Sequence, residues 1–162
     1  MADLDPVRVT HSYSQLNDAP PVTVFPLLCP MREGEWVPGW QYQMIYSRSG
    51  VAELDCVFVT PEEDGGETVW QCTEYDPERF AIAYAWVRPQ VMTAQIRIRL
   101  AARAEGNTDA YITYTYTALS EQGAAELRRM DRAWFEHKMQ SWQMAINHYL
   151  RTGKLIDSAA WE

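Results

Sequence analysis

The sequence predicts an α+β domain in which a curved antiparallel sheet of about seven strands wraps around one long C-terminal helix. Two observations predict this fold class. Between residues 41 and 119, segments of alternating apolar and polar residues follow one another and are separated by short turn signals, as in an antiparallel meander. Residues 121–151 contain no proline and are rich in helix-forming residues. The buried face of the sheet needs a cover, and this helix is the only element long enough to provide it.

The first 40 residues predict one strand and a short helical connector. Residues 7–13 alternate between apolar and polar side chains, which indicates a strand. Residues 17–21 end this pattern, and residues 24–28 then supply a short apolar face. Pro26 and Pro30 keep any helix in this region brief, because proline lacks the backbone N–H of a helix interior. We therefore expect a short helical segment after the first strand.

About six consecutive strands are expected in the central part of the chain. The clearest is residues 92–100, where five apolar residues alternate with polar ones, as in a strand with one wet face and one buried face. The other segments are less regular but are bounded by glycine, proline, asparagine and aspartate. The predicted strands are 41–46, 53–58, 69–75, 80–86, 92–100 and 110–119.

The last helix is predicted to start after Ser120, which is a good N-cap residue, and to stop near Arg151 and Gly153. A helical wheel of this segment gathers large apolar residues on one broad side. Asp131 and Lys138 interrupt that side. Either both reach water at the helix edge, Lys138 by means of its long stem, or they border a partly polar cavity and orient a ligand.

The length of 162 residues favours a single domain over residues 1–162, and we expect its core at about residues 6–156. Apolar residues make up 47% of the chain and aromatic residues 12%. The net charge of −8 disfavours nucleic acids and anionic membranes as partners. We expect no membrane insertion, because no long apolar run or signal peptide is present. Three cysteines without metal-type spacing favour a reducing cytoplasm, with no metal and no cofactor. A homodimer is compatible with the sequence.

A sheet curled around a single helix encloses more volume than the helix can fill, so inward aromatic side chains can surround a hollow. They can equally be packed core. Alternation places Glu74 on the same inward face as Trp70 and Cys72, so it either reaches water at the strand end or, if enclosed, acts as an acid or base. Glu33 and Glu35 are expected at the surface. The candidate cavity residues are Trp40, Phe58, Trp70, Tyr84, Trp86, Ile96, Ile98, Tyr114, Trp134 and Trp142, with Asp131, Lys138 and Glu74 as polar groups.

Four stretches resemble one known superfamily. They are residues 24–30 (VFPLLCP), 32–40 (REGEWVPGW), 74–77 (EYDP) and 114–123 (YTYTALSEQG). The resemblance covers about residues 6–156 and is to a bacterial-type branch of the START-related, helix-grip superfamily called SRPBCC. Birch-pollen allergens, lipid-transfer START domains and the aromatase/cyclase proteins of polyketide synthesis belong to it. The resemblance implies a helix-grip fold and an internal cavity for apolar molecules, and it assigns no catalytic residue.

Three functions are compatible with these predictions. The first is binding or carriage of a small hydrophobic or aromatic molecule in the cavity. The second is an enzyme of the cyclase, dehydratase or hydrolase kind that uses Asp131, Lys138 or Glu74 for proton transfer, which requires a titrating group inside the cavity. The third is a protein-interaction module, which would be favoured by a filled interior and exposed Trp36 and Trp40.

Overall fold

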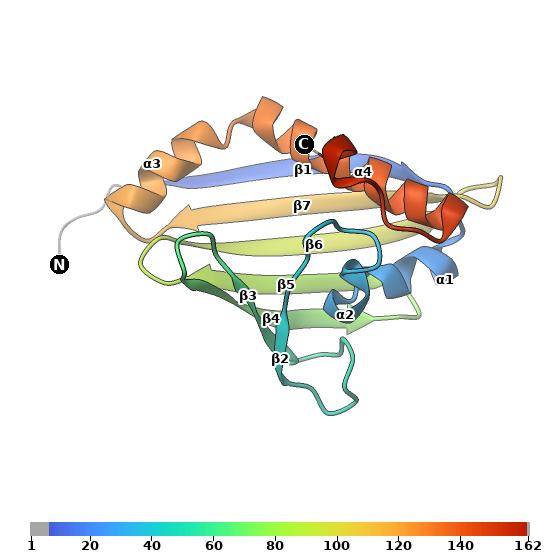
Figure 1. The fold of residues 1–162 in the computed structure, drawn as a ribbon, viewed down its shortest axis with the longest axis horizontal. Helices are drawn as coiled ribbons and strands as arrows, with labels where there is room; N and C mark the ends of the chain where they lie inside the picture. Colours follow the sequence, from blue (N-terminus) through green and yellow to red (C-terminus); the bar gives the residue numbers. More distant parts are fainter. Residues whose placement is uncertain (1–6, 162) are drawn as a thin grey trace.

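The computed structural model describes residues 7–161 and contains one seven-stranded antiparallel sheet with the strand order β1-β7-β6-β5-β4-β3-β2 (Figure 1). Every strand pairs with its neighbour in an antiparallel register. The expected domain limits at residues 1 and 162, and the start of the core at residue 6, lie outside the described residues. The strands are β1 (Arg8–Asn17), β2 (Gln43–Tyr46), β3 (Val57–Pro61), β4 (Glu67–Asp76), β5 (Ala81–Arg88), β6 (Met92–Ala102) and β7 (Thr108–Ala118).

The helices lie at the two positions that the sequence predicts. Between β1 and β2 the chain forms three short helical turns, namely α1 (Pro21–Val24), η1 (Phe25–Leu28) and α2 (Pro30–Glu33). After β7 come α3 (Glu121–Arg129) and the long α4 (Arg132–Thr152), followed by η2 (Ser158–Ala160). Helix α4 packs along β1 and covers one face of the sheet (Figure 1). The predicted helix-grip architecture is therefore confirmed.

The core lies between the inner face of the sheet and α4. The apolar side of β6 and the inward side chains of α4 belong to the same buried cluster, which includes Ile96, Ile98, Phe135, Met139 and Ile146. The period of two along β6 and the helical period along α4 point these residues toward one another. This packing fixes the position of α4 relative to the strands.

Residues 47–56 form a loop, although the sequence predicts a strand from residue 53 to residue 58. The carboxylate of Glu53 accepts hydrogen bonds from the backbone N–H groups of Arg48 and Ser49 and from the hydroxyl of Ser47. Asp55 has a φ of 66°, which a regular strand does not allow. The loop is therefore held by its own polar side chain, and strand pairing begins only at Val57.

The C-terminal helical segment is divided in two, where the sequence predicts one continuous helix from residue 121. Helix α3 ends at Arg129, and the backbone carbonyl of Met130 accepts a hydrogen bond of 2.8 Å from the His11 ring of β1. Asp131 is the N-cap of α4, and its side chain accepts from the backbone N–H of Trp134 at 2.8 Å. An aspartate satisfies the free N–H groups of a first helical turn, which favours a new helix start at this position.

Gly123 lies where α3 approaches the loop between β5 and β6. A Cβ atom on Gly123 would lie 1.8 Å from the backbone oxygen of Val91, so Gly123→Ala forces the helix and the loop apart. We expect this substitution to lower the free energy of unfolding by about 1–3 kcal/mol, the usual cost of overpacking. Urea denaturation followed by circular dichroism measures the loss. Gln122→Ala on the exposed side of the same turn is the control, and equal stability of the two variants would contradict the prediction.

Candidate ligand-binding cavity

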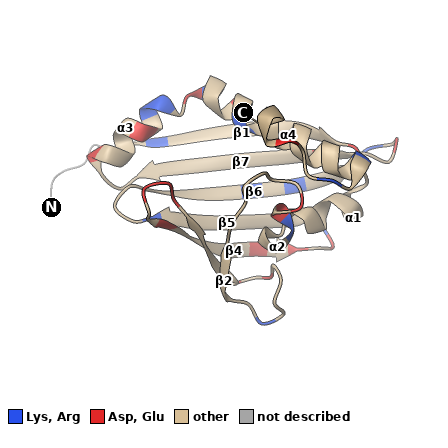
Figure 2. Ribbon diagram, viewed as in Figure 1, with Lys and Arg blue, Asp and Glu red and all other residues tan. Residues whose placement is uncertain are grey.

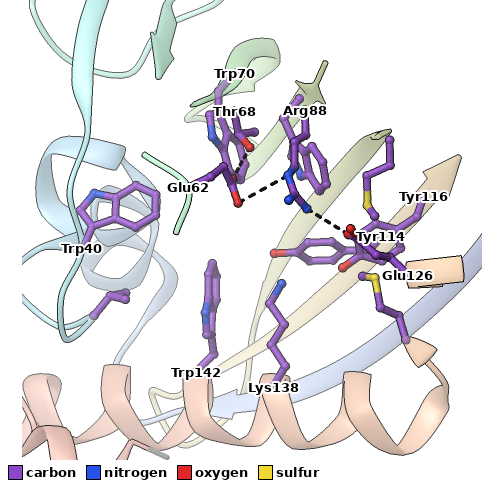
Figure 3. A pocket seen from close by; sticks show the side chains of 14 residues that line it. Trp40, Glu62, Thr68, Trp70, Arg88, Tyr114, Tyr116, Glu126, Lys138 and Trp142 are labelled. Carbon is purple, nitrogen blue, oxygen red and sulfur yellow. Dashed lines mark hydrogen bonds and ion pairs between the residues drawn. The ribbon is translucent and has the colours of Figure 1, made fainter. Parts of the chain in front are cut away.

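A cavity of about 330 Å³ lies between the inner face of the sheet and α4 (Figure 3). Side chains of strands β4 to β7 form its wall on one side, and α4 contributes Lys138 and Trp142 on the other. The connector after α2 contributes Val37 and Trp40. The whole lining consists of Val37, Trp40, Glu62, Thr68, Trp70, Trp86, Arg88, Met92, Tyr114, Tyr116, Glu126, Met130, Lys138 and Trp142.

Aromatic rings in contact with one another form most of the sheet side of the cavity. Trp70 lies 5.8 Å from Trp86, ring centroid to ring centroid, and Trp86 lies 6.1 Å from Tyr116. Tyr116 in turn stacks on Tyr114 at 5.5 Å. These rings come from β4, β5 and β7, at positions that all point to the same face of the sheet, and the small Ala94 of β6 lies between Trp86 and Tyr116. Their contacts make a flat-sided apolar wall.

A smaller pocket of about 30 Å³ continues from the main cavity. Trp40, Trp70, Tyr114 and Trp142 line both spaces, so the two are adjacent. The smaller pocket is otherwise lined by Glu33, Phe58, Tyr84, Ile96 and Ile98. The hydroxyl of Tyr84 donates to the backbone oxygen of Leu28 at 3.0 Å, so this polar group is already satisfied. Glu33 is the one carboxyl group among the lining residues of the smaller pocket.

Glu33 is buried at the end of α2 and forms no hydrogen bond or ion pair through its carboxyl group with any described residue. Burial without a compensating partner disfavours the charged form and raises the pKa of Glu33 to about 8. At neutral pH this group is a neutral carboxylic acid. It can donate one hydrogen bond into the smaller pocket and accept others.

Lys138 extends from α4 into the main cavity beside Trp142 (Figure 3). Its Nζ atom lies 5.0 Å from the ring centroid of Tyr114 and 5.3 Å from that of Trp134, so the ammonium contacts two aromatic faces. Lys138 forms no ion pair with a described carboxylate. Desolvation lowers the pKa of Lys138 to about 8. The amine therefore remains mostly protonated at neutral pH.

Two phenol groups of β7 also belong to the lining. Burial raises the pKa of both Tyr114 and Tyr116, so both hydroxyls stay protonated. The hydroxyl of Tyr116 is buried and has no hydrogen-bond partner in the structure. A buried hydroxyl without a partner is costly unless water or a ligand satisfies it.

Arg88 closes one end of the cavity with a group of ion pairs. Its guanidinium lies 3.8 Å from Glu62, 3.1 Å from Asp64 and 2.9 Å from Glu126, measured nitrogen to oxygen. Glu62 and Asp64 belong to the acidic hairpin between β3 and β4, and Glu126 belongs to α3 (Figure 2). Arg88 thus joins the hairpin to α3, and its single positive charge is outnumbered by the three neighbouring carboxylates.

A surface groove of about 440 Å³ leads toward the cavity between the connector and the β3–β4 hairpin. It shares Val37, Trp40 and Glu62 with the cavity lining. Trp40 is held in place because its indole N–H donates to the backbone oxygen of Pro30 at 2.8 Å. Ligand access through this groove would pass along the face of Trp40.

The structure brings almost all of the predicted wall residues together. Trp40, Trp70, Trp86, Tyr114 and Trp142 line the main cavity, and Phe58, Tyr84, Ile96 and Ile98 line the smaller pocket. Trp134 lies outside both linings and is 39% exposed on α4, although it touches the Lys138 ammonium. Of the three predicted polar groups, Lys138 alone lies in the lining.

Asp131 and Glu74 lie outside the linings of the cavity and of the smaller pocket. Asp131 is an exposed N-cap, because the helix that was expected to carry it starts one residue later. Glu74 pairs with Arg99 of β6 at 2.8 Å on the outer face of the sheet. The reason is a β-bulge between Cys72 and Glu74, which shifts the pairing with β5 by one residue and reverses the direction of later side chains. Strict alternation cannot anticipate an inserted residue of this kind.

Glu33 was expected at the surface together with Glu35, and for Glu33 this expectation is wrong. Glu35 is the partly exposed partner of Arg32 at 2.9 Å. Glu33 precedes the buried Trp36 by one helical turn, and that spacing places both side chains on the inward side. Arg88, Glu62 and Glu126 were also missed, because they come from three distant segments that only the fold brings together.

No described cysteine side chain forms a hydrogen bond with a described histidine side chain. Cys29, Cys56 and Cys72 are buried free thiols. Residues 7–161 contain no group of three or more potential metal ligands. No described helix is both long enough and apolar enough to cross a lipid bilayer.

Comparison with known proteins finds similarity at the level of structure. Norcoclaurine synthase from Thalictrum flavum matches with a TM-score of 0.66 and 10% identity over 91% of this chain and 88% of that one. The protein Ara h 8.0201 matches with a TM-score of 0.62 and 12% identity, covering 90% and 99% of the two chains. The di-domain aromatase/cyclase BexL of the BE-7585A biosynthetic pathway gives 0.67 and 15%, covering 88% of this chain and 46% of that chain. No family model and no curated protein sequence matches the chain. At these identities the likeness concerns the fold.

Proposed function

We propose that this protein binds and carries a small hydrophobic or aromatic molecule in the cavity between the sheet and α4. Its fold is the helix-grip fold of the START-related (SRPBCC) superfamily. The observation that supports this proposal best is the unfilled volume of about 330 Å³ behind a wall of touching aromatic rings. One similar structure, a norcoclaurine synthase, was determined with dopamine and hydroxybenzaldehyde, which are both small aromatic molecules.

The size of the cavity suits a ligand of one to three rings. Pockets for small molecules range from about 300 to 1,000 Å³, and this one lies at the lower end of that range. Burying about 200 Å² of apolar ligand surface contributes roughly 5 kcal/mol before the entropic costs of binding. The flat walls of Trp70 and Tyr114 favour planar ligands, because offset stacking adds to simple burial.

Titration with naphthalene, anthracene and a long-chain fatty acid tests this proposal. We expect saturable quenching of tryptophan fluorescence by the aromatic probes, because four tryptophans line the cavity. Val37→Phe places a larger side chain in the lining and should weaken binding at least tenfold. The matched control Val51→Phe changes an exposed valine of the 47–56 loop and should leave binding unchanged. If no apolar probe gives a saturable response, the proposal fails.

An enzyme acting on an apolar substrate in the same cavity is the second candidate. Such an enzyme needs a titrating group in the cavity. Lys138 lines the main cavity and Glu33 lines the smaller pocket, and each has a pKa of about 8. Groups that titrate near the working pH are suited to proton transfer. A carrier releases its ligand unchanged, whereas a cyclase, dehydratase or hydrolase alters its mass or its retention time. Chromatography with mass spectrometry of ligand recovered after incubation separates the two candidates.

A protein-interaction module is less well supported. That function would be favoured by a filled interior with Trp36 and Trp40 exposed as a patch. Trp36 is completely buried, and Trp40 belongs to the cavity wall. We therefore place the function inside the cavity.

A further inference from the structure

We propose that the ligand is an aromatic carboxylate whose carboxylate group binds the ammonium of Lys138. This inference rests on the proposed function and specifies the chemical class of the ligand. It depends on three features of the cavity: the ammonium of Lys138 has no anionic partner, the buried hydroxyl of Tyr116 has no hydrogen-bond partner, and the other charged side chains of the lining are already ion-paired.

Lys138 contacts only aromatic faces at its charged end. Its Nζ lies 5.0 Å from the centroid of Tyr114 and 5.3 Å from that of Trp134, and no described carboxylate pairs with it. An ammonium held in an apolar cavity loses hydration that aromatic faces replace only in part. An anion arriving beside it restores the lost interaction, so the cavity favours a negatively charged group at this point.

Among the charged groups that line the cavity, Lys138 is the one that forms no ion pair with a described residue. Glu62 and Glu126 are paired with Arg88, which also holds Asp64. Glu33 is neutral below pH 8. The titratable groups that line the cavity and its smaller continuation are Glu33, Glu62, Tyr84, Arg88, Tyr114, Tyr116, Glu126 and Lys138. The two carboxylates Glu62 and Glu126 and the two cations Arg88 and Lys138 make the lining formally neutral, so the preference for an anion rests on direct contact with Lys138, where an amine would meet a like charge.

Tyr116 offers a second polar group next to Tyr114, the ring that Lys138 contacts, because the two tyrosine rings stack at 5.5 Å. Tyr116 belongs to the cavity lining, and its hydroxyl is buried and has no hydrogen-bond partner. A carboxylate has two oxygens, so it can pair with an ammonium and accept from a phenol hydroxyl at the same time. A neutral aromatic hydrocarbon satisfies neither group. The aromatic wall then binds the ring of the ligand, and Lys138 selects its charge.

Three naphthalene probes of similar shape test the inference: 2-naphthoate, 2-naphthamide and 2-naphthylmethylamine. In tryptophan fluorescence titrations at pH 6.5, we expect naphthoate to bind about tenfold to a hundredfold more tightly than naphthamide. We expect naphthylmethylamine to bind more weakly than naphthamide. Equal affinities of naphthoate and naphthamide would overturn the inference while leaving the proposed function intact. Absence of binding by all three probes would instead remove the proposed function.

The two lysines of the chain provide a matched pair of variants. Lys138→Met keeps an apolar stem of similar length, and it should bring the affinity for naphthoate down to that for naphthamide. Lys154→Met changes an exposed residue outside the cavity lining and should keep the wild-type preference. Circular dichroism checks the fold of both variants. A preference for naphthoate that persists in folded Lys138→Met would overturn the inference.

The pH dependence of wild-type binding gives a readout that needs no variant. Lys138 loses its proton above pH 8, so the affinity for naphthoate should fall by up to about tenfold per pH unit there, while the affinity for naphthamide stays nearly constant. Ionisation of Glu33 in the same range acts in the same direction for an anion. Comparing Glu33→Gln with wild type separates the two contributions. An affinity ratio of naphthoate to naphthamide that is constant from pH 6.5 to pH 9.5 would overturn the inference.

Discussion

Replacing Trp36 with alanine is expected to lower the free energy of unfolding by about 3–5 kcal/mol, which is a large part of the stability of a domain of this size. Trp36 is fully buried, and its indole N–H donates to the backbone oxygen of Leu27 at 2.9 Å. Its ring also meets that of Trp142 edge to face at 5.2 Å. The substitution removes all three contributions and leaves the oxygen of Leu27 without its buried partner.

Urea denaturation followed by far-UV circular dichroism measures this loss. Trp134→Ala is the matched control, because it removes the same side chain from a partly exposed position on α4 and should cost less than about 1 kcal/mol. Equal losses in the two variants would contradict the role given to Trp36. Ligand binding should suffer as well, because the connector that Trp36 anchors also supplies Glu33, Val37 and Trp40 to the cavity.

The fold was predictable because its signals are local and repeated. Along β6 every second residue is apolar, so both the strand and its buried face follow from sequence order alone. Ser120 and Gly153 mark the two ends of the C-terminal helical region, and the structure confirms both as caps. The strand expected at residues 53–58 begins only at Val57, because Glu53 binds backbone N–H groups of its own loop, a local contact that alternation does not reveal.

The sequence predicts the aromatic residues of the cavity wall much better than it predicts the polar residues of the lining. Aromatic wall residues such as Trp70 and Trp86 lie before the bulge in β4 or on regular β5, so alternation places them correctly. Glu74 follows the bulge and faces outward. Lys138 was anticipated because it interrupts an apolar helix face, whereas Glu33 ends a helix of only four residues, which is too short to give a periodic pattern in the sequence.

Glu33 should make the protein more stable at pH 5 than at pH 8 by about 3–4 kcal/mol. The pKa of Glu33 is raised from 4.5 to about 8 in the folded protein, whereas in the unfolded chain it is the ordinary value. Between these two values the folded protein holds a proton that the unfolded chain has released. Each pH unit in this window therefore costs about 1.4 kcal/mol of stability, and the loss is complete above pH 8.

Glu33→Gln removes this titration and keeps the size of the side chain. We expect the variant to match wild type near pH 5 and to be more stable than wild type at pH 8, as measured by urea denaturation at several pH values. Glu35→Gln is the control: ion pairing with Arg32 lowers the pKa of Glu35, so its effect falls below pH 4.5. Parallel stability profiles of wild type and Glu33→Gln between pH 5 and pH 8 would contradict the prediction.

The titration of Lys138 does not obscure this measurement, because it acts in a different window with the opposite sign. The pKa of Lys138 is lowered from 10.5 to about 8, so the folded protein releases a proton that the unfolded chain keeps between pH 8 and pH 10.5. Stability contributed by this group rises with pH in that window. The titrations of Glu33 and Lys138 together should therefore give a minimum in the free energy of unfolding near pH 8. A bound carboxylate ligand should make this minimum shallower, because it holds Lys138 in its charged form.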